Sequence, residues 1–231
     1  MEIVTKYQTK NTAYQTATPI APVGIILHST GANNPNLRRY VDYPERLGVN
    51  QFGNHFNRGN ADQIAHYYIG LEKDGKVIAV QTLPLDIACW GCGGGNKGSA
   101  NYNPHAHIQI EICEDQTADQ TYYTACFKGA AELCADLCRE YGWSSEAVIS
   151  HKEAAEQGLA SAHEDPEHWL SKNGHSMTWF RTLVKKRMNG KTPTTMYRVH
   201  AGSFKQRGGA EAMSRKLEEA GFETWIEEVT L

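Results

Sequence analysis

The stretch Val23-Gly24-Ile25-Ile26-Leu27-His28-Ser29-Thr30 is an apolar run that ends at a histidine. A second stretch, Val148-Ile149-Ser150-His151, has the same arrangement and is followed by a polar loop. Short apolar runs of about four to eight residues, bounded by turn residues, are typical of buried strands. Each stretch therefore predicts a strand that delivers a histidine at its carboxyl end.

Other strands are predicted around these two. Residues Ile108–Ile112 alternate strictly, with isoleucine on one face and His107, Gln109 and Glu111 on the other. The segments 64–71 and 76–82 flank Lys73-Asp74-Gly75, which predicts a hairpin.

The remaining pattern indicates helices and loops, and together with the strands it predicts a mixed α/β domain. Residues 119–141 have helical spacing and stop before Gly142, a residue typical of helix ends. A closing helix is expected within 169–188. The first 20 residues are predicted to be an extended lead-in, and residues 31–62 a long surface region of loops and short helices.

A third segment, which is polar, contains Asp165 directly before Pro166. Two strand-end histidines, His28 and His151, and the Asp165 carboxylate are the parts of a zinc centre, since catalytic zinc usually takes three protein ligands and leaves one position open. A zinc ion there would activate water for hydrolysis. Each residue also has a plainer interpretation, because a lone histidine is often a hydrogen-bonded structural residue and Asp-Pro often starts a turn.

Composition limits the classes of partner. The net charge of −3 argues against nucleic acid, whose binders normally carry a basic stripe. No window approaches the 18 or so apolar residues of a membrane span. Residues 1–6 lack the basic and apolar segments of a secretory signal, so we expect synthesis in the cytoplasm without a signal peptide.

The chain has six cysteines. Those in the predicted helix, Cys126, Cys134 and Cys138, fall on its apolar face and are interpreted as small buried thiols. Cys89 and Cys92 form a lone C-x-x-C without two further ligands nearby, so a second metal or a redox role is a minor alternative.

Four segments occur in one order: residues 26–30 with His28, 108–112 with Glu111, Ser150-His151, and 163–166 with Asp165. This order resembles the zinc-dependent N-acetylmuramoyl-L-alanine amidases (amidase type 2, within the peptidoglycan-recognition-protein-like superfamily) over roughly residues 20–180. The resemblance implies a central mixed β-sheet flanked by helices, and one Zn²⁺ held by His28, His151 and Asp165.

The resemblance also suggests roles for three other residues. It makes Glu111 the general base, although a solvated outer strand face would explain that residue as well. His163 stands where relatives commonly have lysine or another polar donor for the oxyanion, and a loop-stabilising role is its alternative. His66 matches a position beside the site and is predicted to bind substrate or, alternatively, to be buried.

The C-terminal part differs in pattern. We predict a catalytic domain at 1–184, a polar linker at 185–195 and a small unit at 196–231. The unit shows strand spacing at 197–204, helical spacing at 210–220 and strand spacing at 222–229, and it resembles half of a SPOR domain, a binder of peptidoglycan glycan strands. Because half a domain is too small to fold alone, we expect two chains to pair there as a homodimer.

The function implied by the resemblance is hydrolysis of the bond between N-acetylmuramic acid and the L-alanine of the stem peptide in bacterial peptidoglycan. A phage or prophage endolysin that acts on the cell wall is expected, with a bacterial autolysin as the less favoured source. Two alternatives are a non-catalytic peptidoglycan-binding module and a cytosolic muropeptide-recycling amidase. A generic zinc peptidase is disfavoured because the sequence has no His-Glu-x-x-His.

Overall fold

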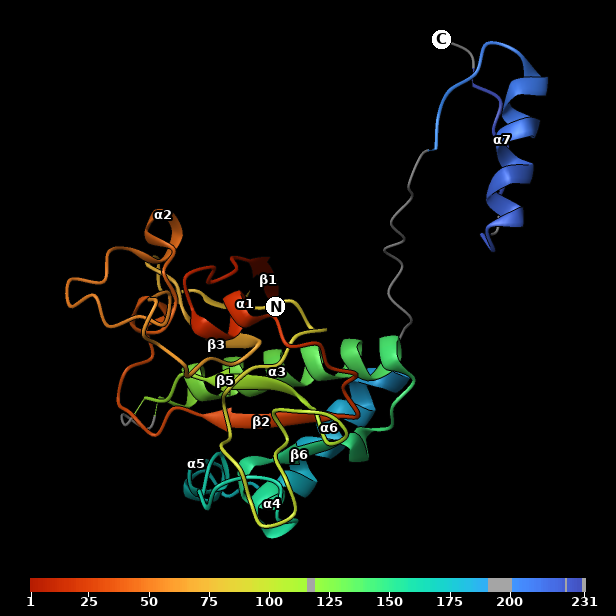
Figure 1. The fold of residues 1–231 in the computed structure, drawn as a ribbon. Helices are drawn as coiled ribbons and strands as arrows, with labels where there is room; N and C mark the ends of the chain where they lie inside the picture. Colours follow the sequence, from red (N-terminus) through yellow and green to blue (C-terminus); the bar gives the residue numbers. More distant parts are fainter. Residues whose placement is uncertain (116–118, 191–200, 223, 230–231) are drawn as a thin grey trace. The chain divides into compact units, whose positions relative to one another are not determined.

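The computed structural model describes residues 1–115, 119–190, 201–222 and 224–229. The chain divides into two compact units, Met1–Thr192 and Pro193–Leu231. The first unit is built on a six-stranded sheet with the strand order β1-β4-β3-β5-β2-β6 (Figure 1). The strands are β1 Glu2–Thr5, β2 Ile25–Ser29, β3 Tyr67–Leu71, β4 Val77–Gln81, β5 Ile108–Ile112 and β6 Val148–Ser150.

The sheet is mixed, as expected. Strands β3 and β4 form the predicted antiparallel hairpin, and the other neighbouring strands run parallel. Strands β2 and β5 are neighbours and pair in a register that places Ile26 beside Gln109 and His28 beside Glu111. Because residues two apart on a strand share a face, His28, Gln109 and Glu111 all lie on one face of the sheet.

The opposite face of the sheet carries the main core. The isoleucines of β5 and Ile25 and Leu27 of β2 pack against helix α3 (Gln120–Tyr141), which includes the fully buried Phe127. Asp119 caps the start of α3 through its side chain, and Gly142 ends the helix with a φ of 70°. Helix α6 (Met177–Asn189) packs along α3 (Figure 1). The face that carries His28 is covered instead by loops and α4 (His151–Glu156), where Ile26 packs on Ala154.

Two expectations for the first unit need correction. The first 20 residues are not an extended lead-in: β1 pairs with β4, and α1 follows at Thr12–Thr16. The closing helix expected within 169–188 is α6, and a shorter helix, α5 (Glu167–Lys172), precedes it; Gly174, with a φ of 71°, lies between the two. Helix α6 continues to Asn189, so the predicted linker begins inside a helix. Short helical elements complete the unit: η1 Leu37–Arg39, α2 Pro44–Leu47 and η2 Ser145–Ala147.

The second unit contains the predicted helix, α7 (Arg207–Glu219). The strand expected at 222–229 is absent from the described residues of that segment, and so is a strand at 201–204. Residues 197–200 of the other predicted strand lie outside the described residues. A strand needs a hydrogen-bonding neighbour, and the described part of this unit offers none. Phe222, Trp225, Ile226 and Val229 are left largely exposed. Among the described residues, no helix is long and apolar enough to cross a membrane.

Candidate metal centre

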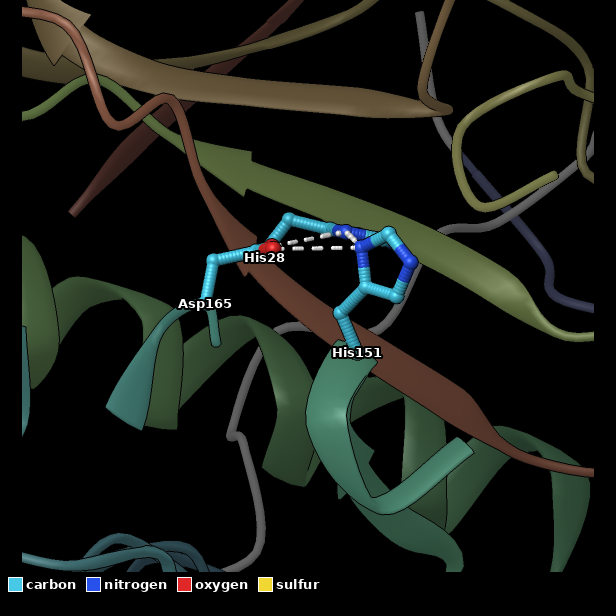
Figure 2. A group of neighbouring side chains, drawn as sticks. All are labelled: His28, His151 and Asp165. Carbon is cyan, nitrogen blue, oxygen red and sulfur yellow. Dashed lines mark hydrogen bonds and ion pairs between the residues drawn. The ribbon is translucent and has the colours of Figure 1, made fainter. Parts of the chain in front are cut away.

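Three separate segments bring His28, His151 and Asp165 together. His28 is near the carboxyl end of β2, and His151 is the first residue of α4, directly after β6. The start of α4 is fixed by a capping box in which Ser150 and Glu153 each bond the other's backbone N–H. Asp165 ends the loop that leads into α5. Figure 2 shows the three side chains pointing at one another, and one ligand atom from each lies within 4.8 Å of the others.

The distances between these atoms are short. His28 Nδ1 is 3.2 Å from His151 Nδ1 and 3.1 Å from Asp165 Oδ2, and His151 Nδ1 is 3.2 Å from Asp165 Oδ1. Both histidines are 2% exposed. Two imidazole nitrogens and a carboxylate that face one point in a buried site form a donor set that suits a cation, and His₂-carboxylate sets are typical of catalytic zinc. The residues present therefore fit a zinc ion.

The ionisation states also suit metal binding. Burial lowers the pKa of His28, which favours the neutral imidazole that a metal requires. Burial opposes ionisation of Asp165, yet the His151 and His28 side chains in contact with it hold the pKa of its carboxyl well below the usual value. Asp165 is therefore a carboxylate at neutral pH.

Glu111 lies beside these three residues, as its register with His28 dictates. It is partly exposed and lines an open cleft of about 780 Å³, together with His28, His151 and Asp165. Burial, followed by the charges of Asp165 and Glu114, raises the pKa of the Glu111 carboxyl. A partly buried carboxyl with a raised pKa in a cleft is the kind of group that takes part in proton transfer.

The other two predicted residues lie in different surroundings. His163 is 58% exposed at the mouth of the cleft, with Nδ1 3.5 Å from Asp165 Oδ1 and its ring stacked on His151 at 4.5 Å. His66 is fully buried: its Nε2 donates to the Ile87 carbonyl, and its Nδ1 accepts from the Gln109 N–H. Since both nitrogens of His66 are occupied by backbone groups, substrate contact does not fit, and the alternative of a buried structural residue does.

Two further polar residues support the centre and are not apparent from sequence patterns alone. Gln109 Oε1 is 3.2 Å from His28 Nε2. The buried Glu114 accepts hydrogen bonds from Ser29 Oγ at 2.5 Å and Gly31 N at 3.2 Å, and it pairs with His168 Nε2 at 2.7 Å. Glu114 thus joins the end of β2 to α5, which begins two residues after Asp165. The strand alternation does place Gln109 on the Glu111 face, but its hydrogen-bond partner is set by tertiary packing.

The cysteines are all free and buried. Burial raises the pKa of the Cys134 thiol well above its usual value and that of Cys126 to about 12, as expected for thiols in a core. Among the described residues, the His28–His151–Asp165 group is the one cluster that suits a metal, and neither Cys89 nor Cys92 belongs to it.

Fold and site together define a class: an α/β domain with a His-His-Asp centre open to a cleft, an arrangement suited to metal-dependent hydrolysis. The chain belongs to the Amidase_2 family, N-acetylmuramoyl-L-alanine amidase, whose model matches residues 18–168.

Two curated relatives are similar over much of the chain. The endolysin of Listeria phage A511 is 25% identical over 181 residues, which cover 74% of this chain and 46% of the relative. The N-acetylmuramoyl-L-alanine amidase CwlL of Bacillus licheniformis is 24% identical over 216 residues, which cover 86% of this chain and 53% of the relative. The chain thus spans about half the length of these relatives.

Solved structures share the fold. Staphylococcus aureus hydrolase AmiA, in complex with its ligand, superposes with a TM-score of 0.59 at 18% identity, covering 81% of this chain and 83% of AmiA. The PlyG catalytic domain superposes with a TM-score of 0.56 at 25% identity, covering 84% of this chain and all of that domain. The mixed sheet flanked by helices is thus confirmed as the family's fold.

Proposed function

We propose that this chain hydrolyses the amide bond between N-acetylmuramic acid and the L-alanine of the stem peptide in bacterial peptidoglycan. The observation that carries the proposal is the convergence of His28, His151 and Asp165 beside Glu111 in an open cleft, in a member of the Amidase_2 family.

His28, His151 and Asp165 are the residues that would hold one Zn²⁺ ion, through the two Nδ1 atoms and a carboxylate oxygen. A bound Zn²⁺ supplies Lewis acidity, which polarises a carbonyl and acidifies water. Glu111 accepts the proton of the attacking water and then returns it to the leaving amine. Its raised pKa makes it a stronger base than an ordinary carboxylate once it is ionised.

In this proposal His163 acts on the scissile carbonyl. Its ring lies against His151 at the mouth of the cleft and is exposed enough to meet a bound substrate. In this role a ring N–H donates a hydrogen bond to the carbonyl oxygen as negative charge develops there.

His163→Ala should lower kcat more than it raises KM, because a donor to a developing oxyanion acts mainly on the transition state. Loss of one such donor typically costs about 10²- to 10³-fold in kcat. Steady-state kinetics on a soluble muropeptide provide the measurement. A rise in KM with an unchanged kcat would instead make His163 a substrate contact or a support of its loop.

The products of digestion test the reaction itself. Purified sacculi treated with the protein should release new L-alanine N-termini without new reducing ends, since the bond cut is an amide and not a glycosidic bond. Binding to sacculi without either product would favour the alternative of a recognition module. Activity on soluble fragments without activity on sacculi would favour a muropeptide-recycling enzyme.

The relative from Listeria phage A511 supports an endolysin, made in the cytoplasm of an infected cell and acting on its wall. The CwlL relative keeps a bacterial autolysin as the second candidate.

We infer that the second unit is a wall-binding segment whose exposed apolar residues are covered by the same unit of a second chain. Phe204, Phe222, Trp225, Ile226 and Val229 are 42–67% exposed. Exposed apolar side chains that gather on one segment are typical of a surface that binds another protein. Two copies in one particle would hold the enzyme on the wall through avidity.

Deletion of the residues after Pro193 should give a monomer that cleaves soluble muropeptides at the rate of the full chain but binds and lyses intact walls less well. Light scattering and pull-down with sacculi measure the two effects. A full-length protein that is monomeric at micromolar concentration would exclude the pairing.

A further inference from the structure

A chain of buried hydrogen bonds leads away from His28 on the side opposite the metal centre. Gln109 is fully buried, and its Oε1 is 3.2 Å from His28 Nε2. Its Nε2 donates to Asn101 Oδ1 at 2.8 Å. Asn101 in turn donates from Nδ2 to the Gly93 carbonyl at 3.1 Å. The chain therefore links a candidate metal ligand to a loop that lines the cleft.

The Gly93 carbonyl at the far end of this series fixes which group donates and which accepts in every hydrogen bond. A backbone carbonyl only accepts, so the Asn101 amide must turn its NH₂ to Gly93 and its oxygen to Gln109. The Gln109 amide must then turn its own NH₂ to Asn101 and its oxygen to His28. Because an amide oxygen cannot donate, the proton of the His28 ring lies on Nε2. A neutral imidazole has one ring proton, which leaves a lone pair on His28 Nδ1, the atom that faces His151 and Asp165.

Gly91 makes room for this arrangement. A Cβ atom at position 91 would overlap the Gln109 Oε1 atom and lie 3.1 Å from its Cδ. Any side chain there would push the amide oxygen away from its place beside His28. The neighbouring Cys92 also contacts this unit, with its Sγ 3.4 Å from Gln109 Nε2 and 3.2 Å from Asn101 Oδ1. The Cys89-Trp90-Gly91-Cys92 segment thus has a packing role that its spacing as a C-x-x-C does not suggest.

We propose that Gly91, Gln109 and Asn101 form a positioning unit that holds His28 in the Nε2–H tautomer, so that its Nδ1 lone pair is kept ready for the metal. This inference rests on the proposed function only for the identity of the metal. Without the Gln109 oxygen, the proton is better placed on Nδ1, where it donates to Asp165 Oδ2, 3.1 Å away. In that tautomer His28 Nδ1 has no free lone pair for a metal. The Gln109 amide therefore acts by preventing this tautomer.

Two variants and a control test the unit in the full chain. Gln109→Met keeps the side-chain length and removes the acceptor, and Gly91→Ala displaces the amide without removing it. Gly94→Ala is the matched control, because a Cβ there meets its nearest atoms at 3.6 and 3.9 Å, which is ordinary contact. One readout is the zinc dissociation constant, from competition with a chelator. The other is the His28 tautomer in metal-free protein, from ¹⁵N chemical shifts.

We expect Gln109→Met and Gly91→Ala to bind zinc about 10- to 100-fold more weakly than wild type, which is the usual effect of losing a group that orients a ligand. Both should shift His28 toward the Nδ1–H form, while Gly94→Ala matches wild type in both readouts. A wild-type tautomer and zinc affinity in folded Gln109→Met would overturn the inference, as would an Nδ1–H tautomer in the wild-type protein. If Gly91→Ala fails to fold, Gln109→Met decides alone.

The two proposals can fail separately. A wild-type protein that binds no zinc, or that cleaves no amide in sacculi, contradicts the proposed function, yet the tautomer of His28 still tests the positioning unit. Conversely, normal zinc binding with an unaffected Gln109→Met variant contradicts the positioning unit and leaves the proposed function intact.

Discussion

His151→Ala should fold, fail to retain zinc through dialysis, and lose nearly all hydrolytic activity. The wild-type protein should hold about one ion per chain, the occupancy of a single three-ligand centre. Removal of His151 leaves only His28 and Asp165, joined across the centre by a 3.1 Å contact that they can make without a metal. Metal polarisation is worth several kcal/mol, and each ~1.4 kcal/mol is a factor of ten in rate, so activity should fall by at least about 10³-fold.

Metal analysis by mass spectrometry measures the first effect, and release of L-alanine termini from sacculi measures the second. His105→Ala is a suitable control, because His105 does not line the cleft and its side chain is only partly buried. A chelator should inactivate the wild-type protein reversibly, and added zinc should restore wild-type activity but not that of His151→Ala. Full zinc occupancy in His151→Ala would remove this residue from the ligand set.

Strands β2 and β5 were predictable because the pattern of their own residues is enough to identify a strand. The apolar run that ends at His28 and the strict alternation of 108–112 each reflect a strand buried on at least one face, and both β2 and β5 have a neighbouring strand on each side. The helix at 119–141 was predictable for the same reason, since its caps, Asp119 and Gly142, stand beside a long apolar face. Strand β1 was missed because it has only four residues at the edge of the sheet, and they alternate between partly buried and exposed, which leaves almost no apolar pattern.

The residues of the metal centre could be predicted from the sequence only in part. Local patterns place His28 and His151 at the ends of strands, but the proximity of β2 to β6 is a property of the sheet order. Ser150 and Glu153 do signal in the sequence that His151 begins a helix, since they match a capping box. The pattern around His66 gives no sign of its depth, because a histidine before a strand looks the same whether it is buried or faces a cleft.

The second unit shows the opposite case, in which the sequence pattern of a strand is present but the strand is not. Residues 222–229 have the composition of a strand, yet the described ones form none in a single chain. Strand formation depends on a neighbouring strand as well as on the residues themselves. A pattern can therefore indicate what a segment would do beside a partner without indicating that the partner is present.

Glu111→Gln should keep zinc and bound muropeptide while its turnover falls by about 10²- to 10⁴-fold, the usual effect of removing a general base. Glutamine has nearly the same shape as glutamate, so the pairing of β2 with β5 and the position of His28 should be unchanged. Its amide oxygen is a very weak base, and it cannot take the proton that the mechanism assigns to Glu111. The loss should therefore appear in kcat, with zinc content and KM close to wild type.

Three measurements separate this outcome from its rivals. Zinc analysis excludes loss of the metal as the cause, and Glu156→Gln, which changes an exposed carboxylate on α4, controls for the charge removed. The pH profile gives the sharpest evidence: wild-type kcat should fall at acid pH as the Glu111 carboxylate is protonated, since a protonated carboxyl cannot accept a proton. The residual rate of Glu111→Gln should lack that acid limb. Near-wild-type turnover in Glu111→Gln, or an unchanged acid limb, would exclude Glu111 as the base and assign the raised pKa of its carboxyl to packing alone.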